Sequence, residues 1–414
     1  MVNREKKHIL FLSYHLPMDD EPGAFRPWME ARLMSRAGFK VTVITSGVQY
    51  MTGKDIRQGK GWCTEEEREG IRILRTWAPT DHRRSLIRRV ANYLSYTVLM
   101  GIAAFSKVGR VNGVFAGTDP IFMMPMVYIV SRFKRAMLVL DERDLFPETA
   151  IALGVIQEGF LSRFLFKMQQ FFRRKSTALV AATPGIRSKL IDYGHPQVNL
   201  LYNGDVFLDE DRHAGGQMSL RKETGKAFIV GYAGGLGRAN DIPTLLRAAN
   251  HLQEIEELGI VIIGSGERRK AYEKFCTSLN NVFFFDAVPR HEARQMMGQF
   301  DVGIQPLPKD KHFCSTLTSK TFDYHGIGIA MIFCGSGDTA KIMAASGGGL
   351  TITPEDDKAL ANALRGLYKD KEQLKGMGES ARRWFEQHIN MQAGVALFAK
   401  VFASQADDQS QQLL

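Results

Sequence analysis

Short β-forming runs alternate with helical segments along almost the whole chain, and this alternation restricts the possible folds more than any other feature. The predicted strands are 8–14, 41–45, 71–75, 114–116, 137–141, 178–181 and 198–201 in the first half, and 228–232, 260–263, 282–285, 302–305, 330–333 and 350–352 in the second. Strands that alternate with helices form parallel sheets covered by helices. The sequence therefore predicts an α/β protein.

The length of the chain indicates that these strands and helices form two domains. A chain of 414 residues is too long for one hydrophobic core. We predict two Rossmann-like domains, 1–205 and 206–386, joined by the polar, glycine-bearing segment 203–219. In open parallel sheets ligands bind beyond the carboxyl ends of the strands, so the predicted site is a cleft where the two sheets face each other.

The stretch 228–246, FIVGYAGGLGRANDIPTLL, is a strand that runs through glycines into a helix. Gly234, Gly235 and Gly237 allow a tight turn and a close backbone approach. Unpaired amides at a helix N-terminus, with Arg238 inside the turn, indicate a diphosphate site. The alternative interpretation is an ordinary strand-to-helix connection with a solvated arginine.

Charge is divided unequally between the two halves. Residues 1–205 carry 30 Lys and Arg against 19 Asp and Glu, whereas the remainder carries 24 against 25. A basic first half indicates an anionic partner, either a membrane surface or nucleic acid. No recognised nucleic-acid module is present, so we predict no nucleic-acid partner. The four cysteines lie far apart, which favours a reducing compartment and argues against structural zinc.

A basic cluster leads into an apolar segment at 81–105, DHRRSLIRRVANYLSYTVLMGIAAF. Arg83, Arg84, Arg88 and Arg89 precede 17 uncharged residues, fewer than the ~20 that a spanning helix needs. We predict a helix that lies on an anionic membrane surface. The alternative is a buried core helix with a basic end. No signal peptide is expected, because only a short strand-like run follows the first basic residues.

Carboxylates gather at a predicted strand end, in the segment 139–154. Asp141, Glu142, Arg143, Asp144 and Glu148 occur there, and such groups bind sugar hydroxyls or act as acids and bases. The same residues also resemble the start of a helix.

A second strand-glycine-helix turn occurs at 260–270, with Asp286 about 20 residues downstream, as in dinucleotide-binding sites. Arg269 replaces the third glycine, which disfavours a nicotinamide cofactor. Asp209, Glu210 and Asp211 spell a metal-binding pattern but lie in the predicted linker, where we interpret them as solvated charge.

Taken together, these segments resemble family 4 glycosyltransferases, which have the GT-B fold. The matching pieces follow the family's order and cover nearly the whole chain: ILFLSYHLP, WMEARLMSRAGFKVTVIT, DERDLFPETAIALG, LLYNGD, YAGGLGRANDIPTLL, VIIGSGERRK, FFFDAVPRHEARQMM, DVGIQPL and TSKTFDYHGIGIAMIF. DLFPE and GRAND are most similar to enzymes that build bacterial surface polysaccharides.

The resemblance implies transfer of a sugar from a nucleotide-sugar, here a UDP-sugar, with retention of configuration and without a metal or other cofactor. The donor would bind the second domain. The acceptor, a polyprenyl-diphosphate-linked lipid or a saccharide, would bind the basic first domain. The protein would be cytoplasmic and peripheral on the inner face of the cell membrane, and its last helix, about 387–414, would return to the first domain.

The resemblance also assigns residues, with several departures from the family pattern. The family's Glu-x7-Glu pair falls on Ser315 and Asp323, and its diphosphate-binding Arg and Lys fall on Gly235 and Asn240. Arg238 and Lys320 are the cations that can replace them, and Arg143 stands where the family has a His. Thr316 would assist at the diphosphate, and Val288 and Arg290 would contact the base.

Two other functions fit the same segments. A nucleotide-sugar epimerase shares the two-domain fold, although it would not need the Arg-rich apolar helix. A catalytically silent GT-B subunit that binds a lipid or an enzyme would explain Ser315.

Overall fold

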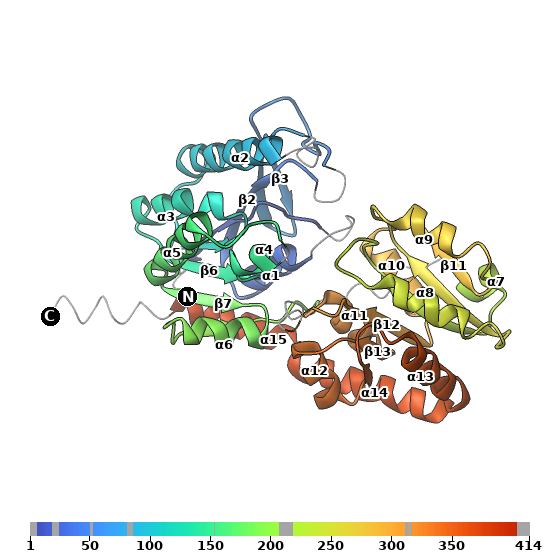
Figure 1. Ribbon diagram of the computed structural model, residues 1–414. Helices are drawn as coiled ribbons and strands as arrows, with labels where there is room; N and C mark the ends of the chain where they lie inside the picture. Colours follow the sequence, from blue (N-terminus) through green and yellow to red (C-terminus); the bar gives the residue numbers. More distant parts are fainter. Residues whose placement is uncertain are drawn as a thin grey trace. The chain divides into compact units, whose positions relative to one another are not determined.

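The computed structural model describes residues 6–18, 25–49, 53–80, 86–152, 154–206, 218–310, 314 and 317–403. The chain forms two compact domains (Figure 1). The first contains the described residues up to 202 together with 391–403, so that the end of the chain returns to it. The second contains the described residues from 203 to 390.

The first domain has an eight-stranded sheet in the order β3-β4-β2-β1-β5-β6-β7-β8. Its parallel strands are β1 (His8–Leu12), β2 (Lys40–Ser46), β4 (Ile71–Thr76), β5 (Gly113–Gly117), β6 (Met137–Glu142), β7 (Ala178–Ala181) and β8 (Val198–Leu200). All seven strands predicted in this half are confirmed, with ends that differ by two residues or fewer.

The sequence analysis missed β3 (Cys63–Arg68), which runs antiparallel to β4 at the sheet edge. Its sequence, CTEEER, lacks the apolar residues that mark a buried strand. Ion pairs with β4 stabilise it instead: Glu65 bonds Arg72, and Glu66 bonds Arg75, each at 2.6 Å.

Two groups of helices cover the first sheet. One face packs against α2 (Leu86–Ser106), η1 (Ile121–Met123), α3 (Met124–Phe133), α5 (Phe160–Lys175) and α6 (Pro184–Asp192). The other face packs against α1 (Arg26–Arg36) and α15 (Met391–Ala403), where the Phe398 ring lies 5.4 Å from Phe115. The short α4 (Glu148–Ala152) follows β6. The predicted amphipathic final helix is therefore present and contributes to this core.

The second domain has a six-stranded parallel sheet in the order β11-β10-β9-β12-β13-β14. The strands are β9 (Phe228–Ala233), β10 (Leu258–Ile263), β11 (Val282–Phe285), β12 (Val302–Pro306), β13 (Ala330–Cys334) and β14 (Gly349–Ile352). They confirm all six strands predicted in the second half. Because β9 lies between β10 and β12, the strand order reverses beside the glycine turn, where ligands bind in such sheets.

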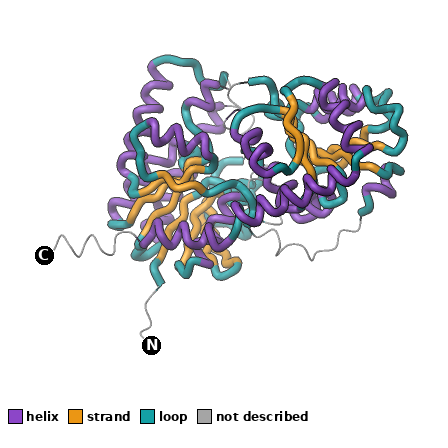
Figure 2. Tube along the Cα trace, turned by 90° about the horizontal axis from the view of Figure 1, so that it is seen from below, coloured by secondary structure: helices purple, strands orange, loops and turns teal. Residues whose placement is uncertain are grey.

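Helices also cover both faces of the second sheet (Figure 2). One face packs against α8 (Ile242–Asn250), α9 (Arg269–Phe275) and α13 (Asp357–Lys369). The other packs against α7 (Leu220–Thr224), α10 (Arg290–Met297), α11 (Ser319–Ile327) and α12 (Asp338–Ser346), while α14 (Lys371–His388) contacts α11, β13 and β14. None of the described helices in either domain combines the length and the apolar character that crossing a membrane requires.

Candidate functional site

The glycine turn after β9 lies directly against Lys320 of α11. Gly234 has φ 156°, and a Cβ atom there would lie 2.4 Å from Cε of Lys320 and 2.7 Å from its Nζ. Only glycine leaves space for the lysine to cross the turn so closely. The structure thus brings together two predicted site residues that are 86 positions apart in the sequence.

Two further glycines explain why α11 lies so close to the sheet. A Cβ on Gly303 of β12 would lie 2.7 Å from the Tyr324 ring, and one on Gly231 of β9 would lie 2.1 Å from the Phe300 ring. The hydroxyl of Tyr324 donates a hydrogen bond to the Gly231 carbonyl at 3.3 Å. The aromatic rings fill the space that the absent side chains leave, and this packing fixes the helix that carries Lys320.

Lys320 is held in a partly apolar setting. Its Nζ lies 5.2 Å from the centroid of the Tyr232 ring, and the Tyr232 hydroxyl donates to the Gly235 carbonyl at 2.9 Å. Burial lowers the pKa of Lys320 to about 8, while the charge of Asp323 acts in the opposite direction. An anion at this position would favour the protonated lysine.

The backbone amides of the turn are less available than we expected. The Gly234 amide donates to the Ile263 carbonyl and the Leu236 amide donates to the Ser265 carbonyl, both at 2.9 Å. Asp241 caps the helix that follows by accepting a hydrogen bond from the Thr244 amide. The prediction of a row of free amides from 234 to 237 is therefore wrong for Gly234 and Leu236, because the neighbouring loop uses them.

Arg238 and the two other turn glycines are accessible. The Arg238 side chain is 81% exposed and lies 3.4 Å from a carboxylate oxygen of Glu267. Gly235 is exposed and Gly237 is half-buried. Lys320 therefore packs onto the turn, whereas the Arg238 side chain extends into solvent.

Asp323 belongs to a buried group of four charges. Arg290 bonds Asp323 at 2.9 Å, and Arg294, one turn further along α10, bonds Asp205 and lies 3.8 Å from Asp323. The sequence analysis missed Arg294 and Asp205 as members of this group. The spacing of the two arginines, four residues apart on one helix face, was the available signal. Val288, the other predicted base contact, is half-buried against the hydrophobic core.

The second glycine turn is filled by an arginine. The Arg269 guanidinium donates to the Gly264 carbonyl at 2.8 Å and pairs with Asp286 at 2.7 Å. Asp286, the carboxylate with which a dinucleotide site would bind ribose, is therefore paired with Arg269, the residue that replaces the third glycine. Several other predicted features lie outside the described residues, namely Ser315, Thr316, the acidic segment 209–211, and Arg83 and Arg84 of the basic cluster.

At the carboxyl edge of the first sheet, the predicted site residues Asp141 and Glu142 are internal counter-ions. Asp141 is fully buried and pairs with Arg26 and Arg143, each at 2.6 Å. Burial, and then the neighbouring Asp141, raise the pKa of Glu30 to about 8. Glu142 is fully buried and bonds Arg173 twice at 2.8 Å. The interpretation of Asp141 and Glu142 as substrate-binding groups is therefore wrong, because neither reaches solvent.

The other residues of that segment differ in accessibility. Arg143 lies over Gly117 of β5 and is 22% exposed. The side chain of Asp144 is exposed, as is that of Asp119 at the end of β5. Partial removal of Asp144 from water by its surroundings, and then the charge of Asp119, raise the pKa of Asp144 to about 6. Glu148 accepts a hydrogen bond from the Tyr193 hydroxyl at 2.7 Å and begins α4, as the alternative helix-start interpretation predicted. Asp119 and Asp144 are thus the accessible carboxylates described at this edge.

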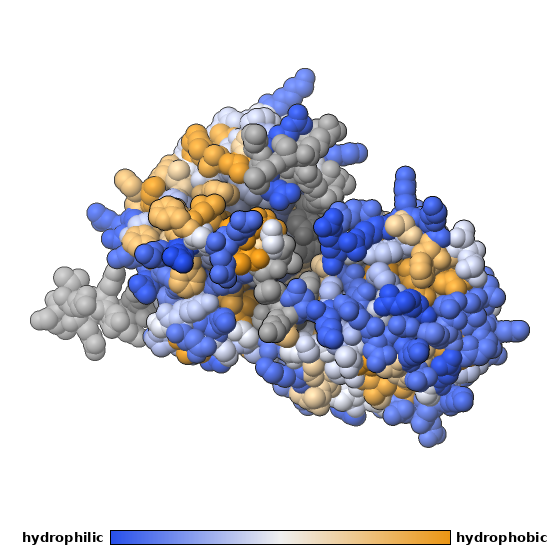
Figure 3. Space-filling view, viewed as in Figure 1, coloured by the Kyte–Doolittle hydropathy of each residue, from blue (hydrophilic) through white to orange (hydrophobic). Residues whose placement is uncertain are grey.

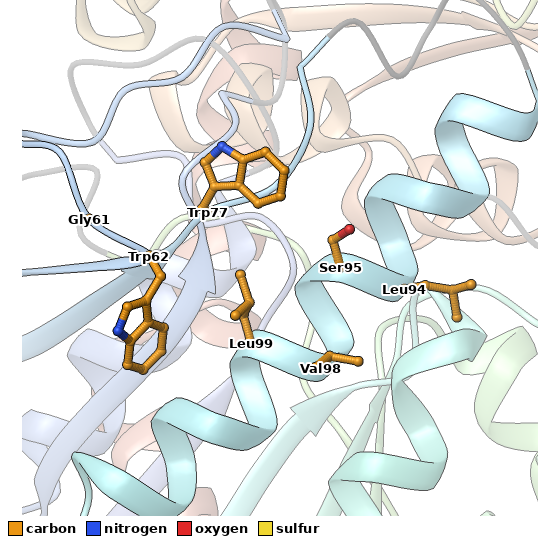
Figure 4. Close-up of a pocket in the computed structure, with 7 residues that line it drawn as sticks. All are labelled: Gly61, Trp62, Trp77, Leu94, Ser95, Val98 and Leu99. Atoms are coloured by element: carbon orange, nitrogen blue, oxygen red, sulfur yellow. The ribbon is translucent and has the colours of Figure 1, made fainter.

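One side of α2 faces the core and another exposes apolar residues. Tyr96 and Met100 are fully buried, whereas Leu94 and Val98 are about half exposed. A pocket of about 740 Å³ lies beside α2 (Figure 4). It is related to the missed strand β3, because the Trp77 amide donates a hydrogen bond to the Trp62 carbonyl and both indoles then lie beside α2.

We call the exposed residues of this region the apolar strip, which consists of Trp62, Trp77, Leu94, Val98, Ile102, Phe105 and Phe133. Figure 3 shows apolar side chains gathered over α2, α3 and α5. Among the described residues, the second domain exposes only Met218 and Phe275 as large apolar side chains. Such a concentration marks an interaction surface on the first domain.

Comparison with known proteins agrees with the two-domain architecture. Residues 219–384, which lie within the second domain, match the family model described as "Glycosyl transferases group 1". A search of curated proteins finds no match to this chain.

Solved structures of the GT-B class match over nearly their whole length. Trehalose 6-phosphate synthase from Burkholderia multivorans has a TM-score of 0.72 at 11% identity, covering 99% of both chains. Anabaena HepE in complex with UDP-glucose has a TM-score of 0.66 at 15% identity, covering 96% of this chain and 99% of HepE. WaaG, a glycosyltransferase involved in lipopolysaccharide biosynthesis, has a TM-score of 0.63 at 16% identity, covering 96% and 100%. The chain therefore has the GT-B fold.

The burial of Glu142 generates a prediction about stability. Glu142→Gln should destabilise the first domain by about 3–5 kcal/mol, because Arg173 would keep a buried charge without its counter-ion. Asp144→Asn, two residues further on and exposed, is the matched control and should not destabilise the domain. Thermal and urea unfolding followed by circular dichroism would measure both. Equal stability of the two variants would contradict the internal role of Glu142.

Proposed function

We propose that the protein is a retaining glycosyltransferase that moves a sugar from a UDP-sugar to a lipid-linked or saccharide acceptor in the synthesis of a bacterial surface polysaccharide. The observation that carries the proposal is the packing of Lys320 on Gly234, beside Asp323, in the domain that matches the group 1 family model. The likeness to HepE with UDP-glucose and to WaaG supports the donor and the pathway class.

The difficult step is cleavage of the bond between the sugar and the diphosphate. Negative charge develops on the leaving UDP and positive character on the sugar carbon, while the acceptor hydroxyl forms the new bond on the same face and loses its proton. A fixed cation near the leaving oxygens stabilises this charge. Lys320 is such a cation, and the exposed Arg238 of the glycine turn would assist it. Because these side chains supply the positive charge, we propose a reaction without a metal.

The remaining donor contacts belong to the same edge of the second sheet. Asp323 would accept hydrogen bonds from the ribose hydroxyls, although Arg290 bonds one of its oxygens. Val288 and Arg290, on the loop and helix after β11, would contact the base. Gly235 and Gly237 leave the backbone accessible on the side where the diphosphate would lie.

The acceptor would bind the first domain. Asp144 is an exposed carboxylate at the carboxyl edge of the sheet and is the candidate base for the acceptor hydroxyl, with Arg143 beside it for an acceptor phosphate. The apolar strip would contact the hydrocarbon part of a polyprenyl lipid and the membrane that contains it. We therefore propose that the protein is peripheral on the cytoplasmic face of the cell membrane.

Transfer with retention is the decisive test of this function. The purified protein should transfer a radiolabelled sugar from a UDP-sugar to a polyprenyl-diphosphate acceptor, and NMR of the product should show the anomeric configuration of the donor. An inverted product would contradict the mechanism. If UDP binds but no donor gives transfer, the silent-subunit interpretation would replace the enzymatic one, since Ser315 stands where the family has a sugar-binding Glu.

The lowered pKa of Lys320 predicts a pH-dependent affinity for UDP. Bound diphosphate favours the charged lysine, so affinity should fall as the pH rises above about 8, by about tenfold between pH 7 and pH 9. Lys320→Met should weaken binding at pH 7 and remove most of this dependence, whereas Lys375→Met, at an 81% exposed site, should do neither. Isothermal titration calorimetry measures both effects. A wild-type affinity that is constant across this range would contradict the assignment of Lys320.

Membrane association should depend on the apolar strip. Replacing Leu94 and Val98 by Ser removes two exposed apolar side chains and should release the protein from vesicles that contain anionic lipid. Phe275→Ser, at a similarly exposed position in the second domain, is the control. Co-sedimentation with vesicles measures the bound fraction. If both variants bind as the wild type does, the strip has another role.

A further inference from the structure

A second pocket, with a polar lining, lies at the amino edge of the first sheet, where β5, β6 and β7 begin. Its volume is about 910 Å³, and it is lined by residues 110–112, by residues 131–138 and by parts of the chain near Lys7, Lys175, Thr177 and Phe402. The accessible carboxylates Asp119 and Asp144 follow the opposite ends of β5 and β6. The pocket is therefore separate from the candidate acceptor site.

The lining of this pocket is cationic without a compensating carboxylate. Six basic residues contribute to it: Lys7, Arg110, Arg132, Lys134, Arg135 and Lys175. Within the described part of the chain, no Asp or Glu lines the pocket and none of the six forms an ion pair. Several other arginines in this domain are paired with carboxylates, as Arg72 is with Glu65 and Arg173 with Glu142.

Local contacts hold two of these cations in place through carbonyl groups. The Lys134 ammonium donates to the carbonyls of Val108 and Gly109, at 2.7 and 3.0 Å, and Lys7 donates to the Phe402 carbonyl at 3.2 Å. Burial lowers the pKa of Lys134. Neutral carbonyls orient these cations but leave their charge uncompensated.

Helix ends explain only part of this arrangement. Arg132 and Lys175 lie in the last turns of α3 and α5, where a cation stabilises the helix dipole. Lys7, Arg110 and Arg135 lie outside helices and receive no such explanation. Arg135 also adopts φ 51°, in the left-handed region that non-glycine residues rarely occupy.

We propose that this pocket binds phosphate groups. Guanidinium groups match the geometry of phosphate oxygens, and several cations around one space suit an anion that carries at least two negative charges. The site does not depend on the proposed transfer reaction, because none of its six basic residues belongs to the donor or acceptor machinery.

The rim of the pocket connects it with the apolar strip. Phe133, which is 77% exposed, lines the pocket and packs against Phe105 of α2 with ring centroids 5.9 Å apart. The same phosphate chemistry occurs in a lipid headgroup and in a free diphosphate. A headgroup would bind the pocket while its acyl chains contact Phe133, whereas a free diphosphate would need only the cations.

Two probes distinguish these sources in the full-length protein. Inorganic pyrophosphate is titrated by calorimetry in the presence of saturating UDP, which blocks the donor site, and vesicles of phosphatidylglycerol and phosphatidylcholine are used in co-sedimentation. The test variant combines Arg110→Gln and Arg135→Gln, whose side chains bond no other described residue. The control combines Lys270→Gln and Lys274→Gln, which removes the same charge from exposed positions in the second domain.

The pocket variant should lose about tenfold or more in affinity for the probe that represents the natural source, while the control variant matches the wild type. A loss confined to pyrophosphate identifies a free phosphate ligand, and a loss confined to vesicles identifies a lipid headgroup. Unchanged UDP affinity and thermal unfolding show that the variant is folded, and Arg132→Gln with Lys175→Gln provides a second pair. If the wild type binds neither probe, or if the pocket and control variants behave alike, the proposal is overturned.

Discussion

The close packing of α11 on the second sheet is the constraint on which the candidate donor site depends. Gly231 and Gly303 lie opposite each other on β9 and β12, and their missing side chains admit the rings of Phe300 and Tyr324. This packing places the first turn of α11 beside the glycine turn after β9, where Lys320 crosses Gly234. A larger residue at any of these glycines would move the helix or the lysine, because packed cores do not deform freely.

The first domain uses its charged residues in three different ways. Asp141 and Glu142 are buried with arginine partners and organise the interior. Asp144 remains accessible at the carboxyl edge, and the cations of the amino-edge pocket are accessible, with no carboxylate partner among the residues that the structure describes. Buried charges require a partner within the protein, whereas accessible unpaired charges are available to a ligand. The same residue types therefore serve stability in one place and recognition in another.

Most of the fold could be predicted because its signals are local. Each parallel strand is a short β-forming run, and all thirteen that were predicted are present. β3 was missed because its stability comes from ion pairs with the next strand rather than from burial. The candidate site was harder to predict: residue types near strand ends indicated where it lies, but the identity of the free amides and accessible carboxylates depends on contacts with distant segments.

The sequence by itself determined the α/β class, the parallel strands of both domains, the glycine turn and the candidate cations, because these depend on composition and spacing along the chain. Only the tertiary structure decided that Lys320 packs on Gly234, that neighbouring carbonyls use two amides of the turn, and that Glu142 is an internal counter-ion. It also gathered the basic residues of the amino-edge pocket from four separate segments. The physical reason is that the burial of a side chain and its bonding partners depend on which segments pack together. The order of residues along the chain does not specify this packing.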